Sequence, residues 1–545
     1  MTDVAHTPSL PGAVRTTQTQ HAPKSRLILI VAVIGGLILL IALFGRIMDF
    51  GIRRDEMLFV APAHLLGRFD LYTDFFYNHL PYSAWLFRGS YLAFGDLGLL
   101  MSARLAVFAG WLLLLGAAMW GVYVVSRAPM LAIFTGVALI TNETLLGQAG
   151  MAASNNLLPL SFGVLALGLF LNEALRGPVR AAPLFCAGLC LSIATGMKIS
   201  AVVIIPPLVI GAFLLPRTLG FVQRLRRVVL PALIGGLLGA APLFLQLLSA
   251  PEVFMAHVTG FHTGPHIAYW EAFRHTEPEL AMSLRDKVVM AYAGWLSGGA
   301  LLLTLGVVAS GWLVLTGARE RAKGIEWGAL LLTLAVLGTT MVMSLVPTPA
   351  FPQYYAAPVV FLPFVGAVLV RALDPQTMRA LVPALAAGMI LMVFLALPRL
   401  GPGLLALRAP AQTEVAQFDA GGREIASVLS EAGLTGPIAT LMPLYPLEEG
   451  LEVYPEIATG QFAYRVADFI TPDLAGHFVM SGPDGMAALF EATPPAALLL
   501  GYEPDLEGPM RAYAQAHGYQ PAAAQSLSNR YGDGVLFIAR GEVAK

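Results

Sequence analysis

Four charged residues stand side by side in the stretch GIRRDEMLF: Arg53, Arg54, Asp55 and Glu56. Only 12% of the chain is charged and 57% is hydrophobic, so this group calls for an explanation. A carboxylate can act as a general base that takes the proton of an attacking hydroxyl, and cations can hold the charge of a departing phosphate. We therefore interpret Asp55, in preference to Glu56, as a candidate base, and the two arginines as candidate ligands for an anion.

The elements that must position these residues are predicted to be membrane helices. The mean hydropathy is +0.71, and long apolar runs recur along the 545 residues, which is typical of a polytopic membrane protein. We predict about eleven spans, in the runs 26–45, 97–125, 130–147, 156–172, 182–197, 199–215, 228–249, 288–316, 326–346, 355–371 and 381–398. Residues 1–25 are polar and are predicted to form a disordered cytoplasmic tail, not a signal peptide.

The distribution of Lys and Arg predicts the orientation. If the N-terminus is cytoplasmic, the inside segments carry cations such as Arg224, Arg226 and Arg227, whereas the short loops around 148–155 and 347–354 carry none. This alternation fits the positive-inside rule. It assigns the transmembrane domain to residues 26–404 and places the loop 46–96, the loop 250–287 and the segment 405–545 outside. The four charges then face water, either as a site or simply as solvated partners of one another.

The C-terminal segment, residues 405–545, differs in charge from the rest of the chain. It has 17 acidic and 7 basic residues, against 17 acidic and 26 basic elsewhere. The apolar patterns PIATLMPLY and AALLLGY, the helical pattern VAQFDAGGREIASVLSEAG and the strand candidate GVLFIAR predict a small α/β domain in the periplasm. The chain has no GxxxxGK[ST] motif and no strand followed by GxGxxG, so we expect neither a nucleotide site nor nucleic-acid binding.

Three further cations fall at predicted outer positions, where they could hold a departing phosphate: Lys198, Arg285 and Lys287. The plainer interpretation is that such residues anchor the ends of spans by reaching toward lipid phosphates. Four histidines of the second outer loop, at positions 257, 262, 266 and 275, have spacings of 5, 4 and 9, which match no standard zinc motif. We therefore predict no metal site from the histidines.

Several of these stretches resemble the GT-C glycosyltransferases, in the branch of the protein O-mannosyltransferases and the lipid A aminoarabinose transferases. The Asp-Glu pair after the first span and YNHLPYSAWL resemble the family's first outer loop. In it Asn78, His79 and Pro81 fit a KPP or HPP element, with Leu80 in place of its first proline. LSIATGMKISAVV, with Lys198, resembles a TKG-like turn, and FPQYYAAPVVFLPF resembles the RYxxPxxP element, with Gln353 where a basic residue often stands.

The resemblance implies a GT-C fold and an integral-membrane enzyme of the bacterial inner membrane. It would transfer a hexosyl or pentosyl group from a polyprenyl phosphate sugar to a glycan, lipid or protein acceptor, with inversion. It also implies roles in substrate binding for Asn78, His79 and Lys198, and it leaves room for a divalent cation held by acidic residues. Tyr354 and Tyr355 belong either to a sugar or lipid pocket or to an interfacial aromatic belt.

Two other functions remain open at this point. A transporter or flippase of lipid-linked sugars would be expected to place charges near the bilayer midplane and to show internal repeats, whereas here the charges gather at the outer boundary. A membrane scaffold whose acidic domain binds a partner would leave the loop of Arg53 to Glu56 unexplained.

Overall fold

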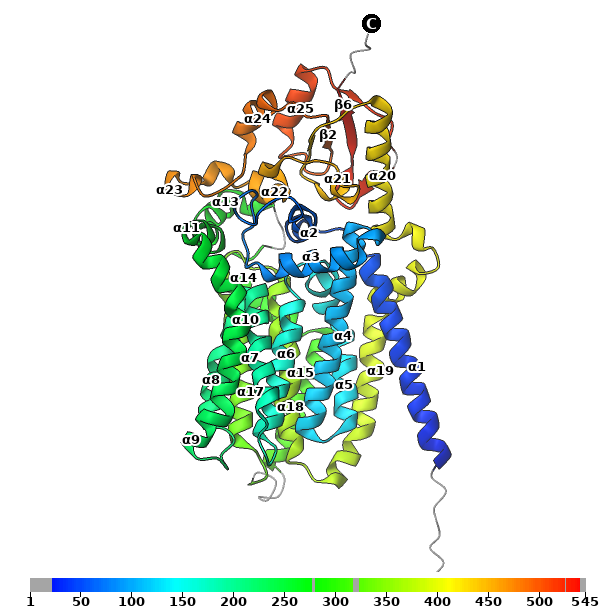
Figure 1. Ribbon diagram of the computed structural model, residues 1–545. Coiled ribbons are helices and arrows are strands. Elements are labelled where there is room, and N and C mark those ends of the chain that lie inside the picture. Colours follow the sequence, from blue (N-terminus) through cyan, green and yellow to red (C-terminus); the bar gives the residue numbers. More distant parts are fainter. Residues whose placement is uncertain (1–21, 277–279, 317–322, 525, 540–545) are drawn as a thin grey trace, which may run out of the picture.

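The computed structural model describes residues 22–276, 280–316, 323–524 and 526–539, and it consists of a helical bundle with a small α/β domain on one end (Figure 1). The predicted disordered tail lies outside the described residues up to residue 21, and helix α1 already begins at Ala22. The N-terminal helix runs along the outside of the bundle, where it packs against α19.

The bundle consists of apolar helices of different lengths, together with the short α9 that precedes α10. They are α1 (Ala22–Met48), α4 (Leu99–Ser126), α5 (Pro129–Ile140), α6 (Leu158–Ala174), α7 (Ala181–Met197), α8 (Ile205–Leu214), α9 (Phe221–Arg224), α10 (Leu230–Ser249), α15 (Gly298–Thr316), α17 (Trp327–Leu345), α18 (Ala356–Arg371) and α19 (Pro375–Ala406). In the described part of the chain, six helices are long and apolar enough to cross a membrane, and five shorter apolar helices accompany them. The predicted runs correspond to helices of the structure, in some cases to more than one helix, but the number of crossings stays a prediction.

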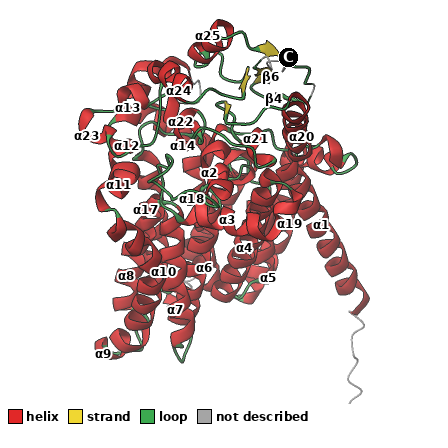
Figure 2. Ribbon diagram, turned by 45° about the horizontal axis from the view of Figure 1, so that its top comes forward, coloured by secondary structure: helices red, strands yellow, loops and turns green. Residues whose placement is uncertain are grey.

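The two long loops predicted between spans form short helices at one end of the bundle (Figure 2). The first loop contains α2 (Arg54–Leu65) and α3 (Tyr82–Phe94), and the second contains α11 (Pro251–Met255), α12 (Phe261–Thr263), α13 (Pro265–Phe273) and the start of α14 (Leu284–Trp295). Helix α14 ends before Gly298, whose positive φ of 49° breaks the helical direction, so the predicted run 288–316 is divided between two helices. Both loops thus lie between the bundle and the C-terminal domain.

The C-terminal domain is a small sheet with helices around it. Its helices are α20 (Glu414–Ala432), α21 (Leu444–Glu448), α22 (Gln461–Tyr464), α23 (Pro472–Ala475), α24 (Met486–Ala492) and α25 (Gly508–Ala516), and its strands are β1 (Ile438–Ala439), β2 (Ala497–Leu500), β3 (Gln520–Pro521), β4 (Ser528–Asn529), β5 (Gly532–Asp533) and β6 (Val535–Ile538). The sheet order is β1-β2-β6-β3, with β1 parallel to β2 and the other pairs antiparallel, and β4 and β5 form a separate pair. The predicted α20, β2 and β6 are confirmed. PIATLMPLY forms only the two-residue β1 and then turns into α21.

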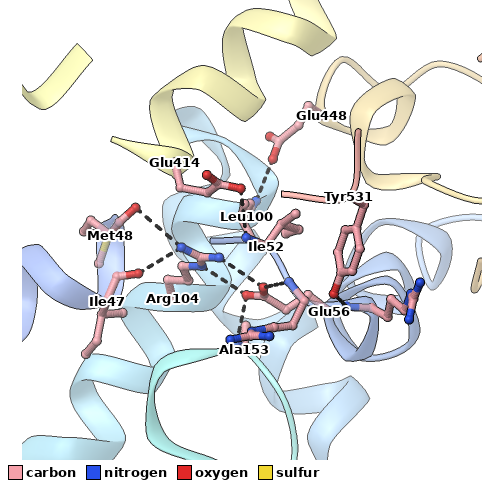
Figure 3. A network of polar contacts seen from close by, with 12 residues as sticks. Ile47, Met48, Ile52, Glu56, Leu100, Arg104, Ala153, Glu414, Glu448 and Tyr531 are labelled. Carbon is pink, nitrogen blue, oxygen red and sulfur yellow. Dashed lines mark hydrogen bonds and ion pairs between the residues drawn. The ribbon is translucent and has the colours of Figure 1, made fainter. Parts of the chain in front are cut away.

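Acidic side chains of this domain accept hydrogen bonds from backbone groups of the bundle end (Figure 3). The Glu448 carboxylate accepts from Leu99 N at 2.6 Å and Leu100 N at 2.8 Å, which satisfies donors at the start of α4. Glu414 accepts from Ile52 N at 2.8 Å, just before α2. The domain is therefore fixed to the segment that carries the four charges of the sequence.

Candidate active site

Glu56 is buried in the first turn of α2 and is paired with a cation, Arg104, that is not among the predicted site residues. Its carboxylate lies 3.0 Å from both Nε and Nη2 of Arg104 on α4, and both side chains are 0% exposed. It also accepts hydrogen bonds from Arg53 N and Ala153 N, both at 2.9 Å (Figure 3). Because both carboxylate oxygens already accept two hydrogen bonds, the geometry assigns Glu56 to anchoring α2.

Asp55, the neighbour of Glu56, keeps part of its surface accessible. Its Oδ2 accepts a hydrogen bond of 2.7 Å from Gln148 Nε2. Burial raises the pKa of the Asp55 carboxyl, while the hydrogen bond from Gln148 and the charges of Lys198 and Arg465 oppose that rise. Asp55 is thus a partly accessible carboxylate with one oxygen held by Gln148, and its other oxygen can accept a proton, as a general base must.

Lys198 lies at the break between α7 and the 3-10 helix η3 (Ile199–Ile204), where its backbone is extended, with φ −148° and ψ 119°. Its Nζ donates to Asn156 Oδ1 at 2.6 Å and lies 4.7 Å from the ring centroid of Tyr354. A partly buried ammonium of this kind can bind an anion such as a phosphate. The charge of Lys198 also acts on the Asp55 carboxyl, which itself is not part of the cavity lining.

A cavity of about 290 Å³ lies between the two long loops and the ends of α6, α7 and α17. Four residues singled out from the sequence line it: Asn78, His79, Lys198 and Tyr354. Most of its remaining wall is apolar, with Pro159, Leu160, Ile199, Val203, Ile204, Val258, Met343, Val346 and Pro347. The cavity therefore combines an apolar lining with a small polar group around one ammonium, which is common for sites that bind small molecules.

Two histidines of the second loop complete the polar part of the cavity. His262 Nε2 lies 2.7 Å from Asn78 O, and the rings of His262 and His266 are 5.6 Å apart. Burial lowers the pKa of His79, of His262 and of His266, which favours their neutral forms. His266 Nδ1 and Asn78 Oδ1 are buried with no hydrogen-bond partner in the described part of the chain, so both are available to a ligand.

The remaining predicted binding residues do not line the cavity. Arg54 donates from Nε and Nη2 to Glu503 of the C-terminal domain, at 2.7 and 2.9 Å, and its guanidinium lies 4.8 Å from the ring centroid of Tyr531. The Arg53 guanidinium lies 4.9 Å from the centroid of the Phe50 ring. These two cations are therefore engaged by the protein itself, Arg54 in a contact between α2 and the domain.

The cations of α14 are also outside the cavity. Arg285 is exposed, whereas Lys287 is buried and donates from Nζ to Thr348 Oγ1 at 2.7 Å and to Leu345 O at 3.1 Å. Tyr355 donates from its hydroxyl to the backbone oxygen of Lys287 at 3.0 Å. Lys287 and Tyr355 therefore fix α14 behind the wall that contains Thr348.

The family resemblance leaves room for a divalent cation held by acidic residues, which stays an expectation. Among the described residues, no group of three or more His, Cys, Asp or Glu side chains is arranged to hold a metal ion. His257 is instead occupied by the backbone oxygens of Tyr77 and His477, each at 3.1 Å.

The comparisons with known proteins agree with the fold that the sequence resemblance implied. No protein-family model and no curated protein sequence matches the chain. Among the solved structures that match the chain are two of ArnT from Cupriavidus metallidurans. The form bound to undecaprenyl phosphate has a TM-score of 0.60 at 16% identity, over 95% of this chain and 98% of that one. The apo form has a TM-score of 0.57 at 15% identity, over 94% and 98%. The chain therefore has the fold of the GT-C glycosyltransferases, as predicted from its loop motifs.

Proposed function

We propose that the protein transfers a sugar from a polyprenyl phosphate carrier to the hydroxyl group of an acceptor, with inversion at the anomeric carbon. The observation that carries this proposal is a largely apolar cavity with the ammonium of Lys198 in its wall, together with a partly accessible carboxylate, Asp55, on which the charge of Lys198 acts. The solved structure of ArnT with undecaprenyl phosphate, which has the same fold, supports a lipid phosphate as the ligand.

The reaction needs one base and one cation. Asp55 takes the proton of the acceptor hydroxyl as its oxygen forms a bond to the anomeric carbon. The bond between that carbon and the phosphate oxygen breaks, and its electron pair leaves with the polyprenyl phosphate. Lys198 stabilises the negative charge that collects on this leaving group. Because the hydroxyl enters opposite the departing phosphate, the configuration at the anomeric carbon inverts.

The composition of the cavity supports a carrier with an apolar tail. Asn78 Oδ1 and His266 Nδ1 offer polar atoms to a sugar, and the apolar wall can receive the first part of a lipid chain. We propose the orientation predicted from the charges, with the N-terminus in the cytoplasm and the C-terminal domain in the periplasm of a bacterial inner membrane. The acceptor would be a glycan, a lipid or a protein that reaches the site from that side.

A transfer assay with radiolabelled polyprenyl phosphate sugars tests this function in purified protein. We expect Asp55→Asn to lower the rate at least about 100-fold, because the base is lost. Lys198→Met should lower kcat and also raise KM for the donor, since it removes the charge that holds the phosphate and that stabilises it as it leaves. Asp96→Asn, in the same loop but exposed, is the matched control and should leave transfer unchanged.

Two results would count against the proposal. Wild-type protein that transfers no sugar from any donor in the panel would refute it, and attention would return to transport or scaffolding. Equal transfer by the wild type and Asp55→Asn, at equal abundance and thermal stability, would remove Asp55 from the chemistry.

A further inference from the structure

The chain between α5 and α6 contacts all three ionised groups of the candidate site. Gln148 donates to Asp55, Ala153 N donates to Glu56, and Asn156 accepts from Lys198. This loop is short and carries no Lys or Arg, so nothing in the sequence drew attention to it. The side chain within it that touches the candidate base is Gln148.

Gln148 lies in a π-helical turn, η2 (Leu145–Ala149), whose backbone departs from helical geometry at Gly147 (φ −90°, ψ −158°). Such turns often occur at functional sites because they redirect a side chain. Gly150 follows, and a Cβ atom there would collide with the oxygen of Leu145 and the ring of Trp111. Trp111 Nε1 donates to the Gly150 oxygen at 2.7 Å. The backbone on the C-terminal side of Gln148 is therefore tightly fixed.

The backbone on the N-terminal side of Gln148 is held by two arginines from distant helices. Arg46 of α1 donates from Nε and Nη2 to Leu146 O, at 3.1 and 2.8 Å, and from Nη1 to the backbone oxygen of Arg399 in α19. Arg399 in turn forms an ion pair of 3.2 Å with Glu143. These contacts fix the turn that presents Gln148 and so limit the positions that its amide can take.

We propose that Gln148 is a positioning residue for the base: its amide holds Oδ2 of Asp55 so that Oδ1 is left to accept the proton of the acceptor hydroxyl. This inference rests on the proposed function for its catalytic part, whereas the contact itself can be tested without turnover. A glutamine serves this purpose because its amide donates a hydrogen bond to the carboxylate and is itself uncharged.

The contact has an electrostatic consequence that a purely structural role would not have. A hydrogen bond to a carboxylate favours its ionised form, so loss of the donor must raise the pKa of Asp55 further. The other ionisable groups that act on Asp55 are Lys198, Arg465 from the end of α22, Glu56 on α2 itself and Tyr354. These stay in place when only Gln148 is changed, which isolates the effect of the amide.

The test compares three variants of the full-length protein. Gln148→Met keeps the length of the side chain but removes the donor, and Gln148→Glu keeps the shape but adds a like charge. Gln515→Met, at an exposed position of α25, is the control. The protonation of Asp55 is followed by infrared spectroscopy, as the pH-dependent carboxyl band that is absent from Asp55→Asn.

We expect the midpoint of this band to move to higher pH by about one unit in Gln148→Met, and further in Gln148→Glu, while the control stays at the wild-type value. In the transfer assay the acid limb of the kcat profile should move by the same amount, with KM for the donor unchanged. Midpoints that coincide with the wild type in Gln148→Met and Gln148→Glu would overturn the inference.

The two readouts separate this inference from the proposed function. A shifted infrared midpoint in a protein that transfers no sugar would refute the proposed function but support the Gln148 contact. A shifted midpoint with an unchanged kcat profile in active protein would overturn the role of Gln148 in catalysis. A shift in both readouts would support it.

Discussion

Replacement of Glu56 by Gln should destabilise the protein rather than act only on the reaction. In the variant, an NH₂ group takes the place of Oε2, which accepts hydrogen bonds from Arg104 Nη2 and Arg53 N. Two donors would then face a third donor. The substitution also leaves the Arg104 guanidinium, which is 0% exposed, without a counter-charge. Removal of one partner from a buried ion pair costs about 3–5 kcal/mol of unfolding free energy. We expect Glu56→Gln to fall in this range.

Thermal unfolding in detergent, followed by intrinsic fluorescence, measures this effect. Glu56→Gln should unfold at a clearly lower temperature than the wild type. The matched control is Glu452→Gln, because Glu452 pairs with Arg68 at 3.5 Å but both side chains are more than half exposed. Exposed pairs contribute little, so the control should unfold like the wild type.

A double variant tests the physical reason. Glu56→Leu combined with Arg104→Met replaces the pair by apolar groups of similar size, and such replacements are often neutral. The double variant should therefore be more stable than Glu56→Leu alone. If Glu56→Gln has the unfolding temperature of the wild type and yet abolishes transfer, the anchoring role is refuted. Glu56 then becomes the candidate base in place of Asp55.

Two other predictions concern the C-terminal domain. Burial raises the pKa of Glu448 from its ordinary 4.5 to about 7, so the folded state binds more protons than the unfolded state between these values. Stability should then fall by roughly 3 kcal/mol as the pH rises through this window, and Glu448→Gln should flatten the dependence of the unfolding temperature on pH. The Arg465 guanidinium lies 4.7 Å from the ring centroid of Trp270 and 5.1 Å from that of Tyr269, both on α13. Arg465→Met should cost about 1–2 kcal/mol of stability and should move the acid limb of transfer to higher pH, whereas Arg465→Lys should do less. An unfolding temperature of Glu448→Gln that depends on pH as strongly as the wild type, or an Arg465→Met acid limb at the wild-type pH, would contradict these predictions.

The sequence predicts best the features that depend on local composition. The apolar runs correspond to helices because twenty apolar residues have few other stable arrangements, and strands β2 and β6 follow from short apolar runs bounded by turn residues. Asp55 and Lys198 could be singled out because charges at predicted outer positions are conspicuous, and His79 and Tyr354 because their stretches resemble motifs of the GT-C glycosyltransferases. The partners of these residues could not be predicted.

Arg104 and Gln148 illustrate why. Arg104 lies within an apolar run, and nothing near it in the sequence indicates a partner. In the structure its Nε lies 3.0 Å from Oε1 of Glu56, which is 48 positions away in the sequence. Gln148 carries no charge and belongs to no motif, and its importance depends on a break at Gly147 that no periodicity announces. The contact of Arg54 with Glu503 could not be predicted for the same reason, because Glu503 lies 449 positions further along the chain.

The charge asymmetry of the chain acquires a physical meaning at the junction of its two parts. Three acidic residues of the C-terminal domain bind groups at the end of the helical bundle. Glu503 pairs with Arg54, Glu414 accepts a hydrogen bond from the backbone before α2, and Glu448 accepts from the first turn of α4. Arg54 and Asp55 are adjacent in the first turn of α2. Glu503 of the domain pairs with Arg54, and Arg104 of α4 pairs with Glu56. Asp55 stands between Arg54 and Glu56 in the sequence, so both contacts limit the movement of its backbone. The domain is thus part of the scaffold that sets the position of the candidate base. Its loss should lower the rate of transfer as well as the stability of the protein.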